Sequence, residues 1–347
     1  MKYLNSLYFL MLCIAITLSS CNDSIEPNDN AIRFSYDTRS LESDYSTAHG
    51  TIATIWGYST NGGWVYSSQN GLTATLNTTD NSFTVAGVNT ENNPEYWSND
   101  SYHFYSLWPP VEDAEVNYEG PNNRDNGLVF EVKTEDQKDQ LMAYFTVSGN
   151  DAASRTTPVH FIYEHINAKL IFNLIKNPAN AGDSIVLISF ALNNVGFEGE
   201  FGYYSSTGLD WVIAPRDKGV IYLYQNSLNP DSTLKNVALN IESDPTKMTY
   251  VNENGYLIIP QDVVINGGSL ISMSFVYGFI DKIDKKTVYK TDTIADYYLP
   301  TSIPKWEQNK KYTYKIYLAA DNNKIMFDSP KVSDWGTKQG GATIIIQ

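Results

Sequence analysis

Cys21 carries the clearest chemical signal in the sequence. It ends the quartet 18–21, Leu-Ser-Ser-Cys, which resembles the lipobox of exported lipoproteins, where small residues let a peptidase reach the bond before a diacylated cysteine. An apolar stretch at 6–18 follows the single basic residue Lys2 and is too short to span a bilayer comfortably. The pattern predicts a lipoprotein signal peptide over 1–20 and a mature chain anchored through acyl chains on Cys21. An ordinary signal peptide followed by a chance cysteine is the alternative.

Charge and cysteine content exclude further classes of function. The chain of 347 residues has a formal net charge of -15, and such an acidic surface repels phosphate backbones, so we expect no nucleic-acid binding. The two cysteines, Cys13 and Cys21, both lie in the first segment, so the folded part has no disulfide framework and no thiolate metal site. The polar residues 21–30 are predicted to form a flexible tether.

The histidines do not predict a metal site or a catalytic site. They are His49, His103, His160 and His165. His160 and His165 are five residues apart, which places them on opposite faces of a strand, so they cannot chelate one ion by themselves. We predict that His165 ends a strand with a satisfied hydrogen bond. The sequence contains no zincin helix, phosphate loop, nucleophile elbow or dinucleotide fingerprint. We therefore expect no enzyme activity, no cofactor and no metal, although a site assembled from distant residues stays open.

Aromatic side chains are another candidate for chemistry, because sugars stack on their flat faces. The chain has 25 Tyr, 14 Phe and 7 Trp. The set that crowds the N-terminal half is Trp56, Tyr58, Trp64, Tyr66, Tyr96, Trp97, Tyr102, Phe104, Tyr105 and Trp108. A glycan platform and a packed core both fit this set. We favour core and interface packing, because Trp and Tyr bury large areas.

The elements that must position these residues are predicted to be strands. Apolar residues alternate with a period of two over 312–318 and over 166–174, as in half-buried strands. Residues 159–163 alternate in the opposite phase, so we expect a bulge or a crossing between sheets near His165. Helix is expected to be scarce, with 134–143 as the best candidate for a short one.

Turn signals indicate the fold class. Asn-Gly pairs, which predict tight hairpins, occur at 61–62, 70–71, 126–127, 254–255 and 266–267. Many short strands joined by such turns are typical of β-sandwiches. We expect an all-β fold, divided within the polar stretch 148–157. The predicted domains are an N-terminal β-sandwich over 31–155 and a C-terminal β-sandwich over 156–347.

The C-terminus is an uncharged, β-branched segment that follows Gly340 and Gly341, which make a hinge. The segment consists of Ala342, Thr343, Ile344, Ile345 and Ile346. Chain ends are usually polar and frayed unless something ties them down, so we expect this one to pair with a sheet edge. Two alternatives remain open: the segment closes its own sandwich, or it serves as a donor strand for another molecule.

Several segments, taken in order, resemble one known family. They are Ala31–Arg39, Tyr96–Pro109, Asp139–Ala143, Val159–Phe172, Trp306–Leu318 and Ile325–Trp335. Together they resemble the fimbrillins, the subunits of type V pili in Bacteroidetes, over nearly the whole mature chain. In that family they correspond to the first strand, an aromatic strand, the end of the first domain, the start of the second and the closing strands.

The resemblance implies two tandem transthyretin-like β-sandwiches with little helix, and a structural or adhesive role in a surface fimbria at the outer membrane. It also implies assembly with other fimbrial subunits by strand exchange, after an arginine-specific protease removes the first strand. Arg39 is the better cleavage candidate, because it follows a strand-like run and precedes the polar stretch 40–49. Arg33 lies inside the strand, where we expect it to be hidden. The alternative, that Arg39 is only a solvated surface residue, has equal weight with the cleavage hypothesis.

The alternative function is a glycan-binding lipoprotein on the outer-membrane surface, which would also be anchored, β-rich and aromatic. A host or bacterial surface receptor or glycan is a possible partner in either case. An exposed row of aromatics in the N-terminal half would favour the alternative, whereas a buried first strand ahead of Arg39 would favour the pilus subunit.

Overall fold

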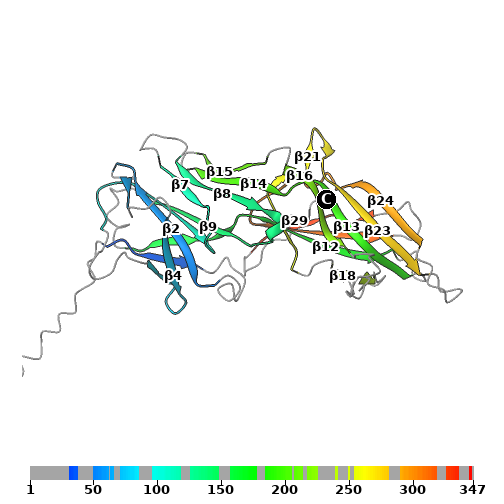
Figure 1. The fold of residues 1–347 in the computed structure, drawn as a ribbon, viewed down its shortest axis with the longest axis horizontal. Coiled ribbons are helices and arrows are strands. Elements are labelled where there is room, and N and C mark those ends of the chain that lie inside the picture. Colours follow the sequence, from blue (N-terminus) through cyan, green and yellow to red (C-terminus); the bar gives the residue numbers. More distant parts are fainter. Residues whose placement is uncertain are drawn as a thin grey trace, which may run out of the picture.

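The computed structural model describes residues 31–37, 50–61, 63–65, 71–85, 96–118, 126–147, 157–177, 184–204, 207–213, 217–225, 239–240, 249–250, 254–280, 290–318, 326–335 and 344–345. The predicted signal peptide, the tether and Arg39 lie outside these ranges. Figure 1 shows the strands gathered into two lobes along the long axis. We call them the N-terminal lobe, made of sheets 1 and 2, and the C-terminal lobe, made of sheets 3 and 4.

Sheet 1 has nine strands and closes on itself. In pairing order they are β10 (Val159–Ile162), β1 (Phe34–Asp37), β5 (Ser82–Val85), β4 (Leu72–Asn77), β2 (Ile52–Ser59), β6 (Tyr102–Trp108), β9 (Leu141–Val147) and β11 (Glu164–His165), with β3 (Gly63–Trp64) paired to β2. β10 and β11 are consecutive along the chain, yet β10 pairs with β1 and β11 pairs with β9. The segment 159–165 therefore joins the two ends of the sheet.

Sheet 2 covers the outer face of sheet 1. Its strands are β15 (Gly208–Val212), β14 (Glu198–Tyr204), β8 (Gly127–Lys133) and β7 (Glu115–Asn117). Strand β6 illustrates that sheet 1 is apolar on both faces. Its residues Phe104 and Trp108 lie in the core enclosed by sheet 1. Tyr105 and Leu107, from the same strand, pack toward sheet 2 in a second core. Alternation along a strand sends neighbouring side chains to opposite faces, and here both faces are buried.

Sheets 3 and 4 face each other across the core of the C-terminal lobe (Figure 1). Sheet 3 consists of β18 (Thr249–Tyr250), β12 (Ala168–Lys176), β26 (Lys310–Leu318), β28 (Lys331–Asp334) and β29 (Ile344–Ile345), with β19 (Tyr256–Ile258) on β12 and β27 (Met326–Phe327) on β26. Sheet 4 consists of β16 (Lys218–Gln225), β13 (Ser184–Gly196), β23 (Ser272–Ile280) and β24 (Lys290–Tyr298), with β17 (Leu239–Asn240) on β13. Phe172 and Tyr314 from sheet 3 meet Phe190 and Phe275 from sheet 4 in this core.

The remaining pieces are short, and the all-β prediction is confirmed. β20 (Gln261–Asp262) pairs with β25 (Lys305–Trp306), and β21 (Val264–Ile265) pairs with β22 (Gly268–Ser269). Helical residues within the described ranges are the 3₁₀ turn η1 (Thr134–Asp136) and Asp217. The segment considered for a short helix, 134–143, thus holds that turn and the start of β9.

The hairpin predictions were right only in part. Asn266 and Gly267, with φ angles of 51° and 79°, form the turn between β21 and β22. The pair at 61–62 lies between β2 and β3, which do pair, although Gly62 is outside the described residues. The pair at 126–127 is not a hairpin, because Gly127 belongs to β8. Nor is the pair at 254–255, since the strands on either side, β18 and β19, both pair with β12. The pair at 70–71 directly precedes β4, and Asn70 is outside the described residues.

The chain passes between the lobes more than once. The crossing expected near His165 is confirmed, because β11 belongs to sheet 1 and β12 to sheet 3. After β13 in sheet 4 the chain returns to sheet 2 as the β14–β15 hairpin, and then β16 re-enters sheet 4. The division near residue 155 and the transthyretin-like layout stay predictions. Strand pairing crosses that position at β1–β10, β9–β11 and β8–β14.

Candidate functional site

The first strand of the folded chain, β1, lies inside sheet 1 between β10 and β5. It runs parallel to β10, with Phe34 opposite Val159 and Asp37 opposite Ile162. The Val159 amide donates to the Arg33 carbonyl over 2.7 Å, and the Tyr36 amide donates to the Asn81 carbonyl over 3.0 Å. Both edges of β1 are therefore occupied by neighbours from distant parts of the chain.

The side chains on the inner face of β1 are core residues. Ile32, Phe34 and Tyr36 are all buried. The Phe34 ring stacks on Phe161 with centroids 5.7 Å apart and meets Phe104 edge-on at 5.5 Å. Tyr36 packs against Phe83 at 4.9 Å. β1 thus contributes to the core of sheet 1 as well as to its hydrogen-bond ladder.

The outer face of β1 is polar. The Ser35 hydroxyl lies 2.9 Å from Nδ1 of His160 on β10, and Nε2 of the same ring lies 3.8 Å from the Asp37 carboxylate. Arg33 is exposed, so the expectation that it would be hidden is wrong for its side chain. Its backbone is nevertheless bonded to Val159. Arg39, the predicted cleavage position, lies just beyond the described end of β1.

Tyr36 also fixes β1 to the turn between β4 and β5. Its hydroxyl donates to the Asn77 carbonyl over 3.3 Å. Burial, and then the negative charge of Asp80, raise the pKa of Tyr36 above its usual value. The pKa of Asp80 itself is lowered by hydrogen bonds from the side chain and backbone of Ser82. The phenol of Tyr36 therefore stays a neutral donor at physiological pH.

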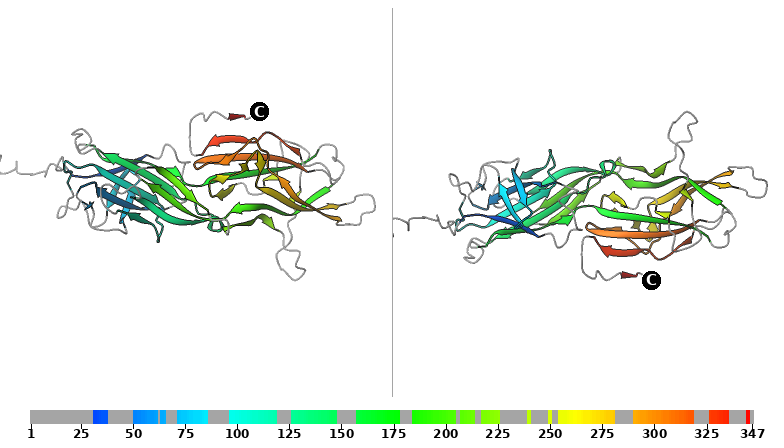
Figure 2. Two further views of the ribbon diagram at one scale, coloured as in Figure 1. Left: turned by 90° about the horizontal axis from the view of Figure 1, so that it is seen from above. Right: turned by 90° about the horizontal axis from the view of Figure 1, so that it is seen from below.

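The C-terminal segment pairs with the edge of sheet 3. β29 runs antiparallel to β28, with Ile344 opposite Val332 and Ile345 opposite Lys331. Figure 2 shows this strand at the outer side of the C-terminal lobe, next to the chain end. Ala342, Thr343 and Ile346 lie outside the described residues. The pairing is compatible with both alternatives for this segment, closure of its own sheet and donation.

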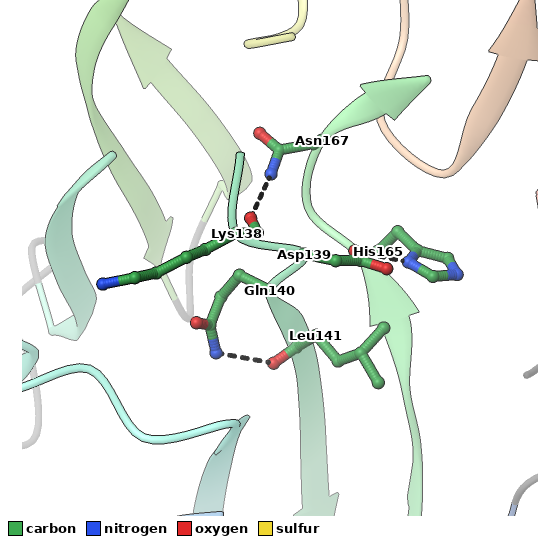
Figure 3. A network of polar contacts seen from close by, with 6 residues as sticks. All are labelled: Lys138, Asp139, Gln140, Leu141, His165 and Asn167. Atoms are coloured by element: carbon green, nitrogen blue, oxygen red, sulfur yellow. Dashed lines mark hydrogen bonds and ion pairs between the residues drawn. The ribbon is translucent and has the colours of Figure 1, made fainter. Parts of the chain in front are cut away.

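A polar network marks the place where the lobes meet (Figure 3). Nδ1 of His165 and Oδ1 of Asp139 are 2.8 Å apart, and His165 is buried at the end of β11. The prediction of a strand-end histidine with a satisfied hydrogen bond is confirmed at Nδ1. The Asn167 amide group donates to the Lys138 carbonyl over 3.5 Å. The network ties the connection between η1 and β9 to the start of the C-terminal lobe.

The other histidines serve separate roles, and His49 is outside the described residues. Nδ1 of His103 lies 2.7 Å from the Tyr144 hydroxyl, and burial lowers the pKa of His103. His160 points outward, whereas His165 is buried, as their spacing predicted. In the ranges that the structure describes, no group of three or more His, Cys, Asp or Glu side chains is arranged to hold a metal ion.

The aromatic set of the N-terminal half is mostly core. The buried members are Trp56, Tyr58, Trp97, Tyr102, Phe104, Tyr105 and Trp108. Trp64 is half-buried, Tyr96 is 43% exposed, and Tyr66 is outside the described residues. Among the described members, therefore, this set forms no exposed platform on which a sugar could stack.

Hollows on the described surface include two of similar size. One, of about 290 Å³, lies between sheets 1 and 2 and is lined by Tyr144, Ile162, Glu164 and Tyr203, among others. The other, of about 280 Å³, lies beside β15 and contains two carboxylates, Asp210 and Asp262, together with Lys218 and Lys305. Each carboxylate there has a lysine to balance it, as is common on a solvated protein surface. Within the described ranges, no helix combines the length and apolar character needed to cross a membrane.

Sequence reasoning found the first strand and the strand at 159–163, but missed that the two pair with each other. The alternation at 159–163 did place His160 outward, on the same side as Ser35 and Asp37. What it lacked was any local signal that β10 pairs with a strand more than a hundred residues earlier.

Comparison with known proteins identifies the family. The family model described as fimbrillin-like matches residues 38–335. A crystal structure of a fimbrial protein from Bacteroides vulgatus aligns over 88% of this chain and 99% of its own, with a TM-score of 0.58 and 14% identity. Proteins of proposed cell-adhesion function from Bacteroides uniformis and Bacteroides ovatus align over 88% of this chain, and over 98% and 97% of theirs. Their TM-scores are both 0.47, at 14% and 16% identity.

No curated protein matches the chain. At such low identity the likeness to the Bacteroides vulgatus structure establishes the fold alone. The family model, in contrast, covers most of the sequence, from the residue after β1 to the residue after β28. The chain belongs to the fimbrillin-like family.

Proposed function

We propose that this chain is a structural and adhesive subunit of a surface fimbria, anchored in the outer membrane through lipid on Cys21 until it is cleaved, and then assembled by strand exchange. In this proposal a protease cuts after Arg39 and β1 leaves sheet 1. The C-terminal segment of a neighbouring subunit then takes its place. The role is structural, so no enzyme activity is part of it. Membership of the fimbrillin-like family supports the fimbrial part of the proposal.

The observation that carries the strand-exchange step is the place of β1. It is the first strand of the described chain and lies between β10 and β5. A cut after Arg39 would leave it attached by hydrogen bonds and apolar contacts alone. Its departure would expose unpaired N–H and C=O groups on both neighbours, together with the apolar side chains that Phe34 and Tyr36 now cover. A strand from another molecule can pair with the exposed N–H and C=O groups and cover the exposed apolar side chains at the same time.

The C-terminal segment has the composition of such a strand. Residues 342–346 are uncharged and mostly β-branched, so they suit the apolar trench that β1 fills. Within the described residues the segment pairs at the outer edge of sheet 3 through a short ladder, Lys331–Ile345 and Val332–Ile344. Release of that ladder would free the segment for a longer pairing elsewhere.

Limited digestion with an arginine-specific protease tests the cleavage and assembly steps together. We expect the mass of the protein to fall by the residues up to Arg39 while the remainder stays intact, and SDS-resistant ladders to follow. Arg39→Ala should abolish both results. Arg33→Lys is the matched control, because it removes the other arginine near β1 but leaves Arg39 available. Cleavage that occurs first at other positions, with Arg39 left whole, would contradict the mechanism.

The anchor is tested separately. Cys21→Ala removes the only thiol available for acylation at the end of the lipobox, so the protein should move from the membrane fraction to the soluble fraction. Retention in membranes after removal of the leader would show that Cys21 is not the anchor.

A further inference from the structure

Four side chains from distant segments meet in one stack at the border of the two lobes. The rings of His165 and Trp335 lie parallel, with centroids 3.6 Å apart and an interplanar angle of 3°. Nζ of Lys169 lies 4.9 Å from the centroid of the Trp335 ring, within cation–π range. Asp139 completes the group through its 2.8 Å contact with Nδ1 of His165. We call these residues the junction stack.

Backbone hydrogen bonds hold the segments around the junction stack on both sides of the border. The Trp335 amide donates to the Asn309 carbonyl over 3.0 Å, and the Asn309 amide donates to the Asn167 carbonyl over 3.0 Å. The Ile166 amide donates to the Gln140 carbonyl, also over 3.0 Å. Segments near residues 140, 166, 309 and 335 are thus held at one point. Both stacked rings are almost fully buried, at 1% and 2% exposure, so the contact is shielded from water.

The position of the stack matters because it joins the two parts of the chain that strand exchange would use. His165 is three residues after Ile162, the last residue of β10, and β10 is the parallel partner of β1. Trp335 is the residue after β28, and the C-terminal segment begins beyond it. Along the chain these two rings are separated by 335 − 165 = 170 positions, a stretch that includes the described strands of sheets 3 and 4 except β29. Across the stack they are in contact.

We propose that the junction stack is a mechanical link, which passes tension from the C-terminal segment directly to β10. The inference rests on the proposed function. In a strand-exchanged fibre each subunit is pulled between the groove beside β10, which holds its neighbour's strand, and its own C-terminal segment. Without the stack, that tension enters β28, which pairs with β26 only from Lys310–Asp334 to Thr313–Lys331. With it, part of the tension reaches β10 without passing through the strands of sheets 3 and 4.

Single-molecule stretching of the monomer tests this link. The chain has no cysteine after Cys21, so a mature protein with Cys21→Ser accepts one handle at Ile162→Cys on β10 and a second at the C-terminus. Ile162 is 57% exposed, which makes it a suitable attachment point. We expect a rupture event between the release of the C-terminal segment and the unfolding of the C-terminal lobe. Trp335→Leu and His165→Leu should each lose that event.

Trp306→Leu is the matched control, because Trp306 is a fully buried tryptophan in the core of the C-terminal lobe, away from the stack. It should lower the melting temperature and keep the rupture event. If Trp335→Leu does not fold, Asp139→Ala tests the link instead. It removes the hydrogen-bond partner of His165 and leaves both rings in place, so it should lower the rupture force. An unchanged event in the stack variants, with only the melting temperature reduced, would overturn the proposal. The measurement uses monomers, so its failure is distinct from a failure of fibre assembly.

Discussion

Tyrosine hydroxyls are among the polar atoms that both lobes bring into their cores, where a hydrogen-bond partner offsets the cost of burial. The Tyr163 and Ser106 hydroxyls are 2.6 Å apart in the core of sheet 1. In the C-terminal lobe, Nε1 of Trp306 donates to the Tyr314 hydroxyl over 2.8 Å. A buried polar atom without a partner costs about 1–3 kcal/mol, so these pairs make the aromatic cores compatible with stability.

Alkaline pH should destabilise the protein through other buried tyrosines, Tyr312 and Tyr144. Burial raises the pKa of Tyr312 from 10.0 to about 12, and burial also raises the pKa of Tyr144 to about 12. The unfolded chain ionises near pH 10 whereas the folded chain keeps the phenols neutral, so this contribution to stability is complete below pH 10 and is lost as the pH rises toward 12. Urea unfolding followed across this range should show a falling free energy of unfolding. Tyr312→Phe should weaken the dependence and Tyr298→Phe, at an exposed position, should not. A free energy that stays constant would contradict the argument.

Single residues were predictable where local pattern decides their environment. The alternation around 159–174 correctly placed His165 inside at a strand end. It could not supply Asp139 as the partner, because that residue arrives from another segment. The exposure of Arg33 was missed for a related reason: residue type and strand position do not state which face of an unknown sheet is outward. The large area that Trp and Tyr side chains bury was enough to predict that the aromatic residues of the N-terminal half pack mostly in the core.

At the scale of elements, the proposed mechanism makes β1 part of the precursor and not of the assembled fibre. Phe34→Ala should lower the free energy of unfolding of the intact chain by about 3–5 kcal/mol, as is typical when a buried phenylalanine is truncated. Ser35→Ala, on the outer face of the same strand, should cost less. Under the proposed mechanism β1 is absent after cleavage, so the SDS resistance of ladders made from processed Phe34→Ala protein should equal that of the wild type. Urea denaturation and gel analysis measure the two effects. Weaker ladders would show that β1 remains in the assembled form.

The C-terminal strand should behave in the opposite way. Deleting residues 342–347 removes β29, whose described pairing with β28 is short. The melting temperature of the monomer should therefore barely change, while assembly after protease treatment should fail. Calorimetry and gel electrophoresis of the same preparation give both answers. A markedly lower melting temperature would support the other alternative, in which the segment closes its own sheet.

The positions of strands along the sequence were more predictable than the pairing between strands. The period-two alternation at 312–318 and 166–174 corresponds to β26 and β12, and both strands are real. That they pair in parallel, in register from Lys169–Lys311 to Lys176–Leu318, has no local signature. The Asn-Gly signal succeeded at 266–267, where the flanking strands pair with each other. It failed at 254–255, where a third strand is the common partner. Local turn chemistry therefore predicts a bend in the chain but not which strands lie on either side.

At the scale of the whole molecule, the lobes are interleaved along the chain. Sheet 2 takes β7 and β8 from before residue 155 and β14 and β15 from after it. Sheet 1 takes β10 and β11 from after it. Side-chain amides reinforce the border: Gln137 donates to the Leu257 carbonyl and accepts from the Leu257 amide, both over 3.0 Å. The N-terminal lobe therefore depends on chain segments from both sides of residue 155, whereas the described strands of sheets 3 and 4 all come from after it.

The interleaving predicts that the N-terminal part will not fold alone. A fragment of residues 31–155 lacks β10, β11 and β14, which pair with β1, β9 and β8 in the structure. It would expose the inner core of sheet 1 along an open seam, and lose the strand of sheet 2 that carries Phe201. We expect little cooperative unfolding and poor amide-exchange protection for this fragment, compared with the same strands in the full chain. Co-expression with residues 156–347 should restore both, because the missing strands return in trans. Cooperative unfolding of the isolated fragment would show instead that residues 31–155 form an independent sandwich, as the polar stretch at 148–157 predicted.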